Sequence, residues 1–185
     1  MNKRRKTLGI IATALLILLL VYVFLSGSVF VFYSVKTADM APTLLEGDTV
    51  YVSRTAYRNS SPQRGDIVLF AVEGTSGEDL LRRVIGMPGD LVQIRDCNIY
   101  INDVLIQENY LAEVPTYPSQ GYEYSTVVPE NCYFVLCDNR AREEDSRNPE
   151  IGFVSILSIK GRATKIIASG DRNTDLTSGE NTNES

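Results

Sequence analysis

The most informative absence in this sequence is histidine, because the 185 residues contain none. Mechanisms that need an imidazole base, such as Ser-His-Asp or Cys-His arrangements, are therefore excluded. Cysteine is scarce: Cys97, Cys132 and Cys137 show no zinc-type spacing, and their odd number leaves one thiol free or paired with another chain. Cys132 and Cys137 lie five residues apart in one expected strand, so they face opposite sides and should not pair. We expect no metal and no cofactor.

Positive charge is also in short supply outside one short segment. The net charge is −5, although Lys3, Arg4, Arg5 and Lys6 crowd the N-terminus. The rest of the chain is therefore more acidic than the total suggests, which argues against nucleic acid as a partner.

An apolar run follows this basic head. Residues 8–25, LGIIATALLILLLVYVFL, carry no charge, and the run continues to Tyr33 if Ser26, Gly27 and Ser28 are tolerated. This length is near the lower limit for spanning a bilayer and predicts one transmembrane anchor. A cleaved secretory signal is the alternative, although no small-x-small cleavage site follows closely. The positive-inside rule places the N-terminus in the cytoplasm and the main domain outside the plasma membrane.

After the anchor, the patterns favour strands. Alternating or continuously apolar segments bounded by turn residues occur at 48–54, 64–72, 80–90, 91–106, 131–139 and 153–167. The Pro- and Tyr-rich segment 114–130 is expected to be a long loop or a loose hairpin. No long amphipathic helix is expected, only a short turn near 141–147. The fold class is mainly β, behind one N-terminal helix.

The domain boundaries follow from these segments. We expect a cytoplasmic basic head at 1–7, an anchor and juxtamembrane segment at 8–33, and an extracellular β domain at 34–168. Residues 169–185 are polar with almost no apolar side chain, and we expect this tail to be disordered.

Several motifs occur in a fixed order in the β domain: MAPTLLEGD, RGDIVLF, RRVIGMPGD, CDNRAREEDSR and GFVS followed by IKGRA. Together, from about Val29 to Ile166, they resemble the boxes of bacterial type I signal peptidases, peptidase S26. The resemblance implies a strongly coiled antiparallel β domain at the membrane surface, with a cleft that binds an extended peptide by strand addition. Members of that family use a Ser nucleophile and a Lys base to cut signal peptides after small residues.

The resemblance breaks at the catalytic positions. Asp39 stands at the nucleophile position, Arg82 at the base position and Glu143 at the position of a supporting hydroxyl. The resemblance implies a peptide-binding role for Thr37, Met40, Pro42, Arg83 and Cys137. The Thr37 position is the one whose hydroxyl helps to form the oxyanion hole in some members of the family. The resemblance also implies structural roles for Asp138, Asn139, Arg140, Asp145, Ser146 and Arg147.

These replacements remove the dyad chemistry. Arginine stays protonated in proteins, so Arg82 cannot be a general base, and Asp39 offers no hydroxyl. Three other arrangements could replace the Ser and Lys pair in catalysis. They are Asp39 and Glu143 as an aspartic pair, Cys137 as a thiol nucleophile, and Thr43 or Ser34 as a hydroxyl nucleophile with Lys36 as base. The hypothesis we prefer is that Asp39, Arg82 and Glu143 form a salt-bridged cluster in place of the catalytic set.

Two functions are compatible with this interpretation. The main one is non-catalytic: a membrane-anchored chaperone or scaffold in sortase-dependent pilus assembly, with pilin subunits or a sortase as partners. This resembles the SipA-type signal-peptidase-like proteins of Gram-positive bacteria, which also carry Asp at the nucleophile position. The alternative is an active signal peptidase that processes the signal peptides of exported proteins with an unorthodox site.

Overall fold

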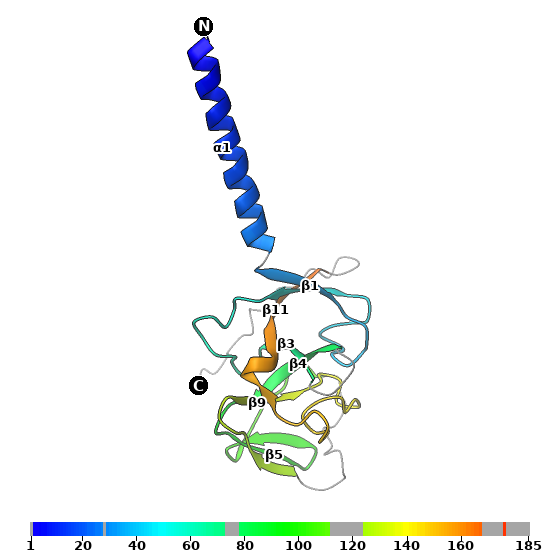
Figure 1. Ribbon diagram of the computed structural model, residues 1–185. Helices are drawn as coiled ribbons and strands as arrows, with labels where there is room; N and C mark the ends of the chain where they lie inside the picture. Colours follow the sequence, from blue (N-terminus) through cyan, green and yellow to red (C-terminus); the bar gives the residue numbers. More distant parts are fainter. Residues whose placement is uncertain (1, 28, 73–77, 112–123, 168–175, 177–185) are drawn as a thin grey trace, which may run out of the picture.

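The computed structural model describes residues 2–27, 29–72, 78–111, 124–167 and 176, and one helix stands apart from a β domain (Figure 1). Helix α1 (Asn2–Gly27) covers the predicted apolar run, and its side chains from Ile10 to Phe24 are exposed along the apolar positions. Within the described residues, no helix has both the length and the apolar character needed to cross a bilayer.

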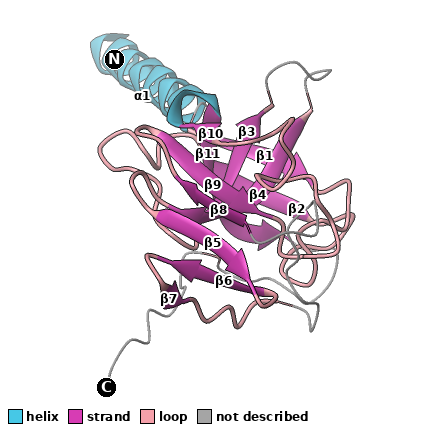
Figure 2. Cartoon of the chain, turned by 90° about the horizontal axis from the view of Figure 1, so that it is seen from below, coloured by secondary structure: helices cyan, strands magenta, loops and turns pink. Residues whose placement is uncertain are grey.

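The β domain contains two antiparallel sheets (Figure 2). The larger follows the order β1-β2-β11-β3-β4-β9-β10, and the smaller the order β7-β6-β5-β8. Their strands are β1 (Phe30–Ser34), β2 (Thr49–Ser53), β3 (Ile67–Ala71), β4 (Asp79–Gly86), β5 (Leu91–Arg95), β6 (Asn98–Ile101), β7 (Val104–Leu105), β8 (Tyr124–Val127), β9 (Cys132–Leu136), β10 (Val154–Ser155) and β11 (Ile159–Ile167). The short helix η1 (Ile156–Ser158) precedes β11. The predicted mainly β fold behind one helix is confirmed.

Strand β3 shows why the large sheet is buried on both faces. Ile67 and Leu69 point into one apolar cluster, and Val68 and Phe70 point into another on the opposite face. The continuous apolar run predicts this two-sided burial. The first cluster is closed by the loop between β1 and β2, which is the segment that carries Asp39.

The strands cross closely where glycine replaces a side chain. At Gly161 an added Cβ would lie 2.4 Å from the Ser53 carbonyl oxygen, so β11 approaches β2 only because the position has no side chain. The bend between β5 and β6 has Asp96 and Cys97 at positive φ, as two-residue hairpin turns require.

The structure corrects one expected boundary and specifies another. Residues 30–33 are expected in the anchor segment, but Phe30–Ser34 form β1, because they pair in register with Ser53 to Thr49 of β2. The segment 114–130 is expected to be a long loop or a loose hairpin, and Tyr124–Val127 of it forms β8 against β5. Residues 114–123 of that segment, and the predicted disordered tail except Leu176, lie outside the described residues.

Candidate functional site

Asp39 is held in place by the loop that follows β9. Its backbone carbonyl accepts a hydrogen bond of 2.9 Å from the Asn139 N–H, and the Asn139 side-chain amide donates to the Ala38 carbonyl at 3.1 Å. Only 6% of Asp39 is exposed. The two segments that carry family motifs therefore meet here, although they are about 100 positions apart in the chain.

Arg82 faces Asp39 from β4. Its Nη2 lies 2.8 Å from Asp39 Oδ2, and the side-chain exposures are 2% for Arg82 and 8% for Asp39. The remaining guanidinium nitrogens are bonded to backbone, Nε to the Glu144 carbonyl at 2.5 Å and Nη1 to the Leu81 carbonyl at 2.6 Å. The predicted ion pair between Asp39 and Arg82 is therefore present and buried.

Two further groups complete the surroundings of Asp39. The Thr37 hydroxyl donates to the same Oδ2 atom at 2.8 Å, and Arg142 Nε lies 3.9 Å from Oδ1 with its side chain 53% exposed. The Thr37 hydroxyl, expected to help form an oxyanion hole, is thus directed at a carboxylate. A negative charge on a substrate oxygen would compete with Asp39 for this donor.

Glu143 does not join the cluster, and this part of the hypothesis is wrong. Its side chain is exposed, and among the described residues it forms no ion pair with Arg82. The backbone turns after Asn139, so that the Glu144 carbonyl reaches Arg82 while neighbouring Arg142 approaches Asp39. Sequence reasoning misses Arg142, because the family boxes place no charge at that position.

A cavity of about 380 Å³ opens beside the ion pair. It is lined by Thr37, Asp39 and Arg82, by the apolar side chains of Val72, Leu80 and Ile151, and by Arg142 and other polar residues from the segment 142–150. Met40 lines a separate pocket of only about 40 Å³ on the other side of Thr37 and Arg82. The cleft predicted next to Asp39 therefore exists, with an apolar wall and a charged rim.

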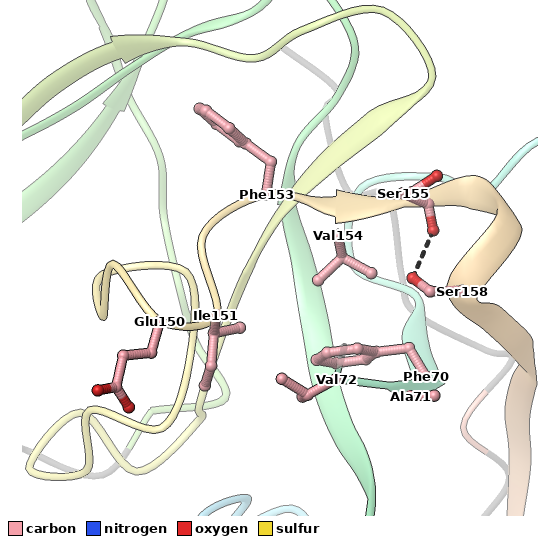
Figure 3. Close-up of a pocket in the computed structure, with 9 residues that line it drawn as sticks. All are labelled: Phe70, Ala71, Val72, Glu150, Ile151, Phe153, Val154, Ser155 and Ser158. Atoms are coloured by element: carbon pink, nitrogen blue, oxygen red, sulfur yellow. Dashed lines mark hydrogen bonds between the residues drawn. The ribbon is translucent and has the colours of Figure 1, made fainter. Parts of the chain in front are cut away.

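A second cavity, of about 280 Å³, shares Val72, Glu150 and Ile151 with the cleft. Figure 3 shows Ile151, Val72 and Phe70 gathered around this space, with Glu150 at its outer side. Beyond them, the Ser158 hydroxyl donates to the Ser155 carbonyl at 2.8 Å. Since the two cavities have a common wall, one extended segment could place alternate side chains in them.

Arg83, predicted to contact peptide, is instead part of a structural network. It binds Asp138 through Nε at 2.8 Å and Nη2 at 2.5 Å, and Thr43 donates its hydroxyl to the same carboxylate at 2.6 Å. The Tyr110 ring lies under the guanidinium, 3.9 Å away. Thr43 is therefore occupied, which argues against its use as a replacement nucleophile. Pro42 is exposed and lines none of the cavities described above.

Cys137 is also not at the cleft surface. It is fully buried, and its backbone N–H donates to Asp145 Oδ2 at 2.9 Å. Burial raises the pKa of the Cys137 thiol well above its ordinary value, so the thiolate is disfavoured. Both observations argue against the thiol nucleophile considered from the sequence.

The remaining motif residues tie the loop after β9 together. Asp145 and Arg147 form a buried ion pair at 2.7 Å, and the Ser146 hydroxyl accepts from the Val135 N–H at 2.9 Å. Arg140 binds Glu108 at 2.5 Å. The predicted structural roles are consistent with these contacts, whereas Glu108 and Tyr110 lie outside every recognised motif and escape sequence reasoning.

The groups that the ion pair and the cleft wall offer can be named from the lining residues. Among the described residues that line the cleft, the only hydroxyl is that of Thr37, and the cation beside it is an arginine. The paired charges give an electrostatically closed set, and the apolar wall can take an aliphatic side chain. The fold and the site define a β-domain protein with a cleft of about 380 Å³ between motif segments that are far apart in the sequence.

Comparisons with known proteins show which family this chain belongs to. The family described as "Signal peptidase, peptidase S26" matches residues 7–168. Signal peptidase I of Bacillus amyloliquefaciens is 36% identical over 143 residues, covering 74% of this chain and 76% of the relative. Signal peptidase I S of Bacillus subtilis is 34% identical over 146 residues, covering 74% and 77%. The chain belongs to the signal peptidase I family, peptidase S26.

Two other matches have a similar sequence identity but cover this chain and the matched protein to different extents. "Probable signal peptidase I-2" of Synechocystis is 37% identical over 135 residues, and the match spans 70% of this chain but 59% of the relative. A crystal structure of a signal peptidase I from Enterococcus faecalis is 37% identical, covers 57% of this chain and 98% of that chain, and has a TM-score of 0.48. The match to the family over residues 7–168 and the identity to the two Bacillus relatives confirm, at the level of the family, the resemblance read from the motifs.

Proposed function

We propose that this chain binds an extended, signal-peptide-like segment in the cleft beside Asp39 and Arg82 and holds it without cutting it. The observation that carries the proposal is the buried guanidinium of Arg82, 2% exposed and 2.8 Å from Asp39. A peptidase of this family type needs a hydroxyl and a neutral amine at these places, and an arginine is not deprotonated in proteins.

The sheet leaves an edge where such a segment can add. β4 pairs with β3 from Asp79 to Arg83, but β9 pairs with β4 only from Arg83 onward. Among the described strands, the stretch 79–82 therefore has a partner on one side only. The Leu81 carbonyl of this stretch already accepts from Arg82 Nη1, and the Asp79 carbonyl accepts from the Tyr33 hydroxyl. An extended peptide added here would therefore pair with the N–H groups of the stretch, and its side chains would reach the two cavities.

Membrane attachment is part of the proposal. The uncharged run inside α1 and the basic head before it support a single-pass protein with a cytoplasmic N-terminus and an external β domain. The acidic β domain makes nucleic acid an unsuitable partner. A peptide emerging from the membrane would meet the cleft at the bilayer surface.

A second candidate is proteolysis, in which the chain processes the signal peptides of exported proteins. The reported relatives support it, because each is named a signal peptidase. These names favour processing over pilus assembly, a role that rests on the resemblance at Asp39 alone. Pilin subunits or a sortase as partners thus stay a prediction, tested by loss of polymerised pilin after gene deletion with signal-peptide processing unchanged.

One experiment separates the two candidates. The purified full chain in mild detergent is mixed with a labelled signal-peptide substrate, and binding is followed by anisotropy while cleavage is followed by mass spectrometry. We expect saturable binding without cleavage, with the Bacillus amyloliquefaciens relative as the cleaving control. Cleavage by the wild-type chain that disappears in Asp39→Ala would establish the second candidate and overturn the first.

A double substitution tests whether the missing Ser and Lys at positions 39 and 82 are all that prevents cleavage. Because Arg82 Nη2 reaches Asp39 at 2.8 Å, a lysine at 82 would place its amine near a serine at 39. We expect Asp39→Ser with Arg82→Lys to cleave the substrate, and each single substitution to remain inactive. Failure of the double variant to cleave, despite binding, would show that Glu143 or the closed packing of Cys137 also prevents catalysis.

A further inference from the structure

A pocket lined by basic side chains lies apart from the cleft, and we call it the cationic pocket. Its volume is about 180 Å³, and Arg54, Arg58 and Lys160 line it together with Tyr57 and apolar residues of η1 and the start of β11. It has no lining residue in common with the cleft cavity. Among the described residues, no carboxylate lines it.

The charge of the cationic pocket is not neutralised in the way that is usual in this domain. Among the described residues from 36 to 165, nearly every Lys and Arg forms an ion pair; the exceptions are Arg54, Arg58 and Lys165. Two of these three unpaired cations line one pocket of an otherwise acidic chain.

Two carboxylates contact residues that line the pocket, and both are engaged with groups other than Arg54 and Arg58. Asp79 pairs with Lys160 at 2.6 Å, and Asp66 accepts from the Tyr57 hydroxyl at 2.8 Å and lies 3.4 Å from Arg162. These carboxylates offset the charges of Lys160 and Arg162, and the charges of Arg54 and Arg58 stay without a partner among the described residues. Two guanidinium groups at one cavity favour an oxyanion with several acceptor atoms, which phosphate provides.

The place of the pocket in the fold points to the source of the phosphate. The Arg54 N–H donates to the Val29 carbonyl at 2.8 Å, so this arginine lies beside the chain two residues after α1 ends at Gly27. Figure 1 shows β1 directly below that end of the helix. Leu157 of η1, next in the chain to the pocket residue Ile156, is 93% exposed, and Phe32 of β1, the strand that begins beside Arg54, is 64% exposed.

Such a combination is typical of a membrane surface. Aromatic side chains gather at the headgroup level, and basic side chains close to the end of a membrane helix attract anionic lipids. Phe32 lies with its ring 5.3 Å from that of Tyr51 on the same sheet face. Free phosphate could satisfy the two arginines, but it would make no use of the exposed apolar side chains beside them.

We propose that the cationic pocket binds the phosphate of an anionic lipid headgroup. Arg54 and Arg58 hold the phosphate, and Leu157 contacts the acyl region. This contact would fix the orientation of the β domain relative to the bilayer. The orientation in turn determines the distance between the cleft and the bilayer surface. The positional argument rests on the membrane attachment proposed for α1, whereas the peptide-binding role of the cleft is independent of it.

The test measures bound lipid directly. The full chain in mild detergent is incubated with equal amounts of phosphatidylglycerol and phosphatidylcholine, and retained lipid is measured by native mass spectrometry. With each basic residue contributing about a fivefold preference for anionic lipid, we expect the variant Arg54→Gln/Arg58→Gln to lose ~25-fold in its preference for phosphatidylglycerol. Lys165→Gln is the matched control, because it removes the third unpaired cation without touching the pocket, and it should keep the preference.

Three results would overturn the assignment. The first is an unchanged phosphatidylglycerol preference in the double variant. The second is an equal loss in Lys165→Gln, which would indicate general charge attraction. The third is displacement of the lipid by an equal concentration of inorganic phosphate, which would identify free phosphate as the ligand. If the double variant unfolds, Arg54→Lys/Arg58→Lys replaces it and must retain most of the preference. Signal-peptide binding measured in the same samples should not change, which separates this proposal from the function of the cleft.

Discussion

The buried pair of Asp39 and Arg82 makes a quantitative prediction about stability. Arg82→Ala removes the hydrogen bond to Asp39 and the two to backbone carbonyls, and leaves a carboxylate that is only 8% exposed in its side chain. Removal of one partner from a buried ion pair costs about 3–5 kcal/mol, because the other charge stays buried without compensation. We expect Arg82→Ala to lower the free energy of unfolding by about that amount.

The reverse substitution should cost less. In Asp39→Ala the guanidinium keeps its bonds to the Glu144 and Leu81 carbonyls, whereas in Arg82→Ala the carboxylate keeps the Thr37 hydroxyl and a distant Arg142. The double variant loses the shared charge-assisted hydrogen bond only once, and such a bond contributes about 1.5–3 kcal/mol. The sum of the single losses should therefore exceed the loss in the double variant by about 1.5–3 kcal/mol.

The assay is urea unfolding of the full chain in mild detergent, followed by near-ultraviolet circular dichroism of the tyrosines, of which the chain has 10 and no tryptophan. Nine of these tyrosines follow α1 and one, Tyr22, lies within it, so the signal reports mainly the β domain. The matched control is a cycle on Arg95 and Asp103, an ion pair at 3.8 Å whose side chains are 35% and 70% exposed. Exposed pairs contribute about 0–1 kcal/mol, so this control cycle should show little coupling.

A coupling energy between Asp39 and Arg82 no larger than that of the control pair would refute the interpretation of the site as a buried salt bridge. If either single variant fails to fold, Asp39→Leu with Arg82→Met replaces the double variant. An apolar replacement of a buried pair is often neutral or stabilising, so this variant should fold at least as well as the singles.

Three further predictions concern the rest of the domain. Gly86→Ala should destabilise the chain by about 1–3 kcal/mol in the same urea assay, since its Cβ would lie 2.6 Å from a valine methyl of β5. A thiol reagent at pH 8 should label exposed Cys97 in the native chain and buried Cys137 only after unfolding, because burial raises the pKa of that thiol; rapid native labelling of Cys137 would contradict the packing. Burial and the Asp66 carboxylate raise the pKa of Tyr57 above its ordinary 10.0, so the hydroxyl keeps its proton when folded. Stability should be complete below about pH 10 and fall above it, and Tyr57→Phe should flatten this alkaline loss.

The sequence predicts most of the sheet, because apolar periodicity determines which strands are buried and on how many faces. It predicts the Asp39–Arg82 contact only through the family resemblance, since nothing in local pattern brings positions 39 and 82 together. The prediction for Glu143 fails because the loop after β9 directs this side chain to solvent. The prediction for Arg83 fails because its partner Asp138, which follows β9, is distant in the sequence. The importance of Glu108 and Tyr110 could not be predicted, because their roles arise entirely from tertiary contacts with Arg140 and Arg83.

The buried ion pair also shows what changed at this site relative to the chemistry implied by its family. A serine and a neutral lysine tolerate burial because neither carries charge, whereas Asp39 and Arg82 each require a partner once buried. Replacement of only one of them would leave an uncompensated charge and a large cost in stability. The presence of both, with the Thr37 hydroxyl directed at the carboxylate, is what a site selected for folding and binding requires. Asp39 and Arg82 are satisfied by each other, by the Thr37 hydroxyl and by two backbone carbonyls, and this satisfied set is the reason why we propose that the cleft holds a segment and does not cut it.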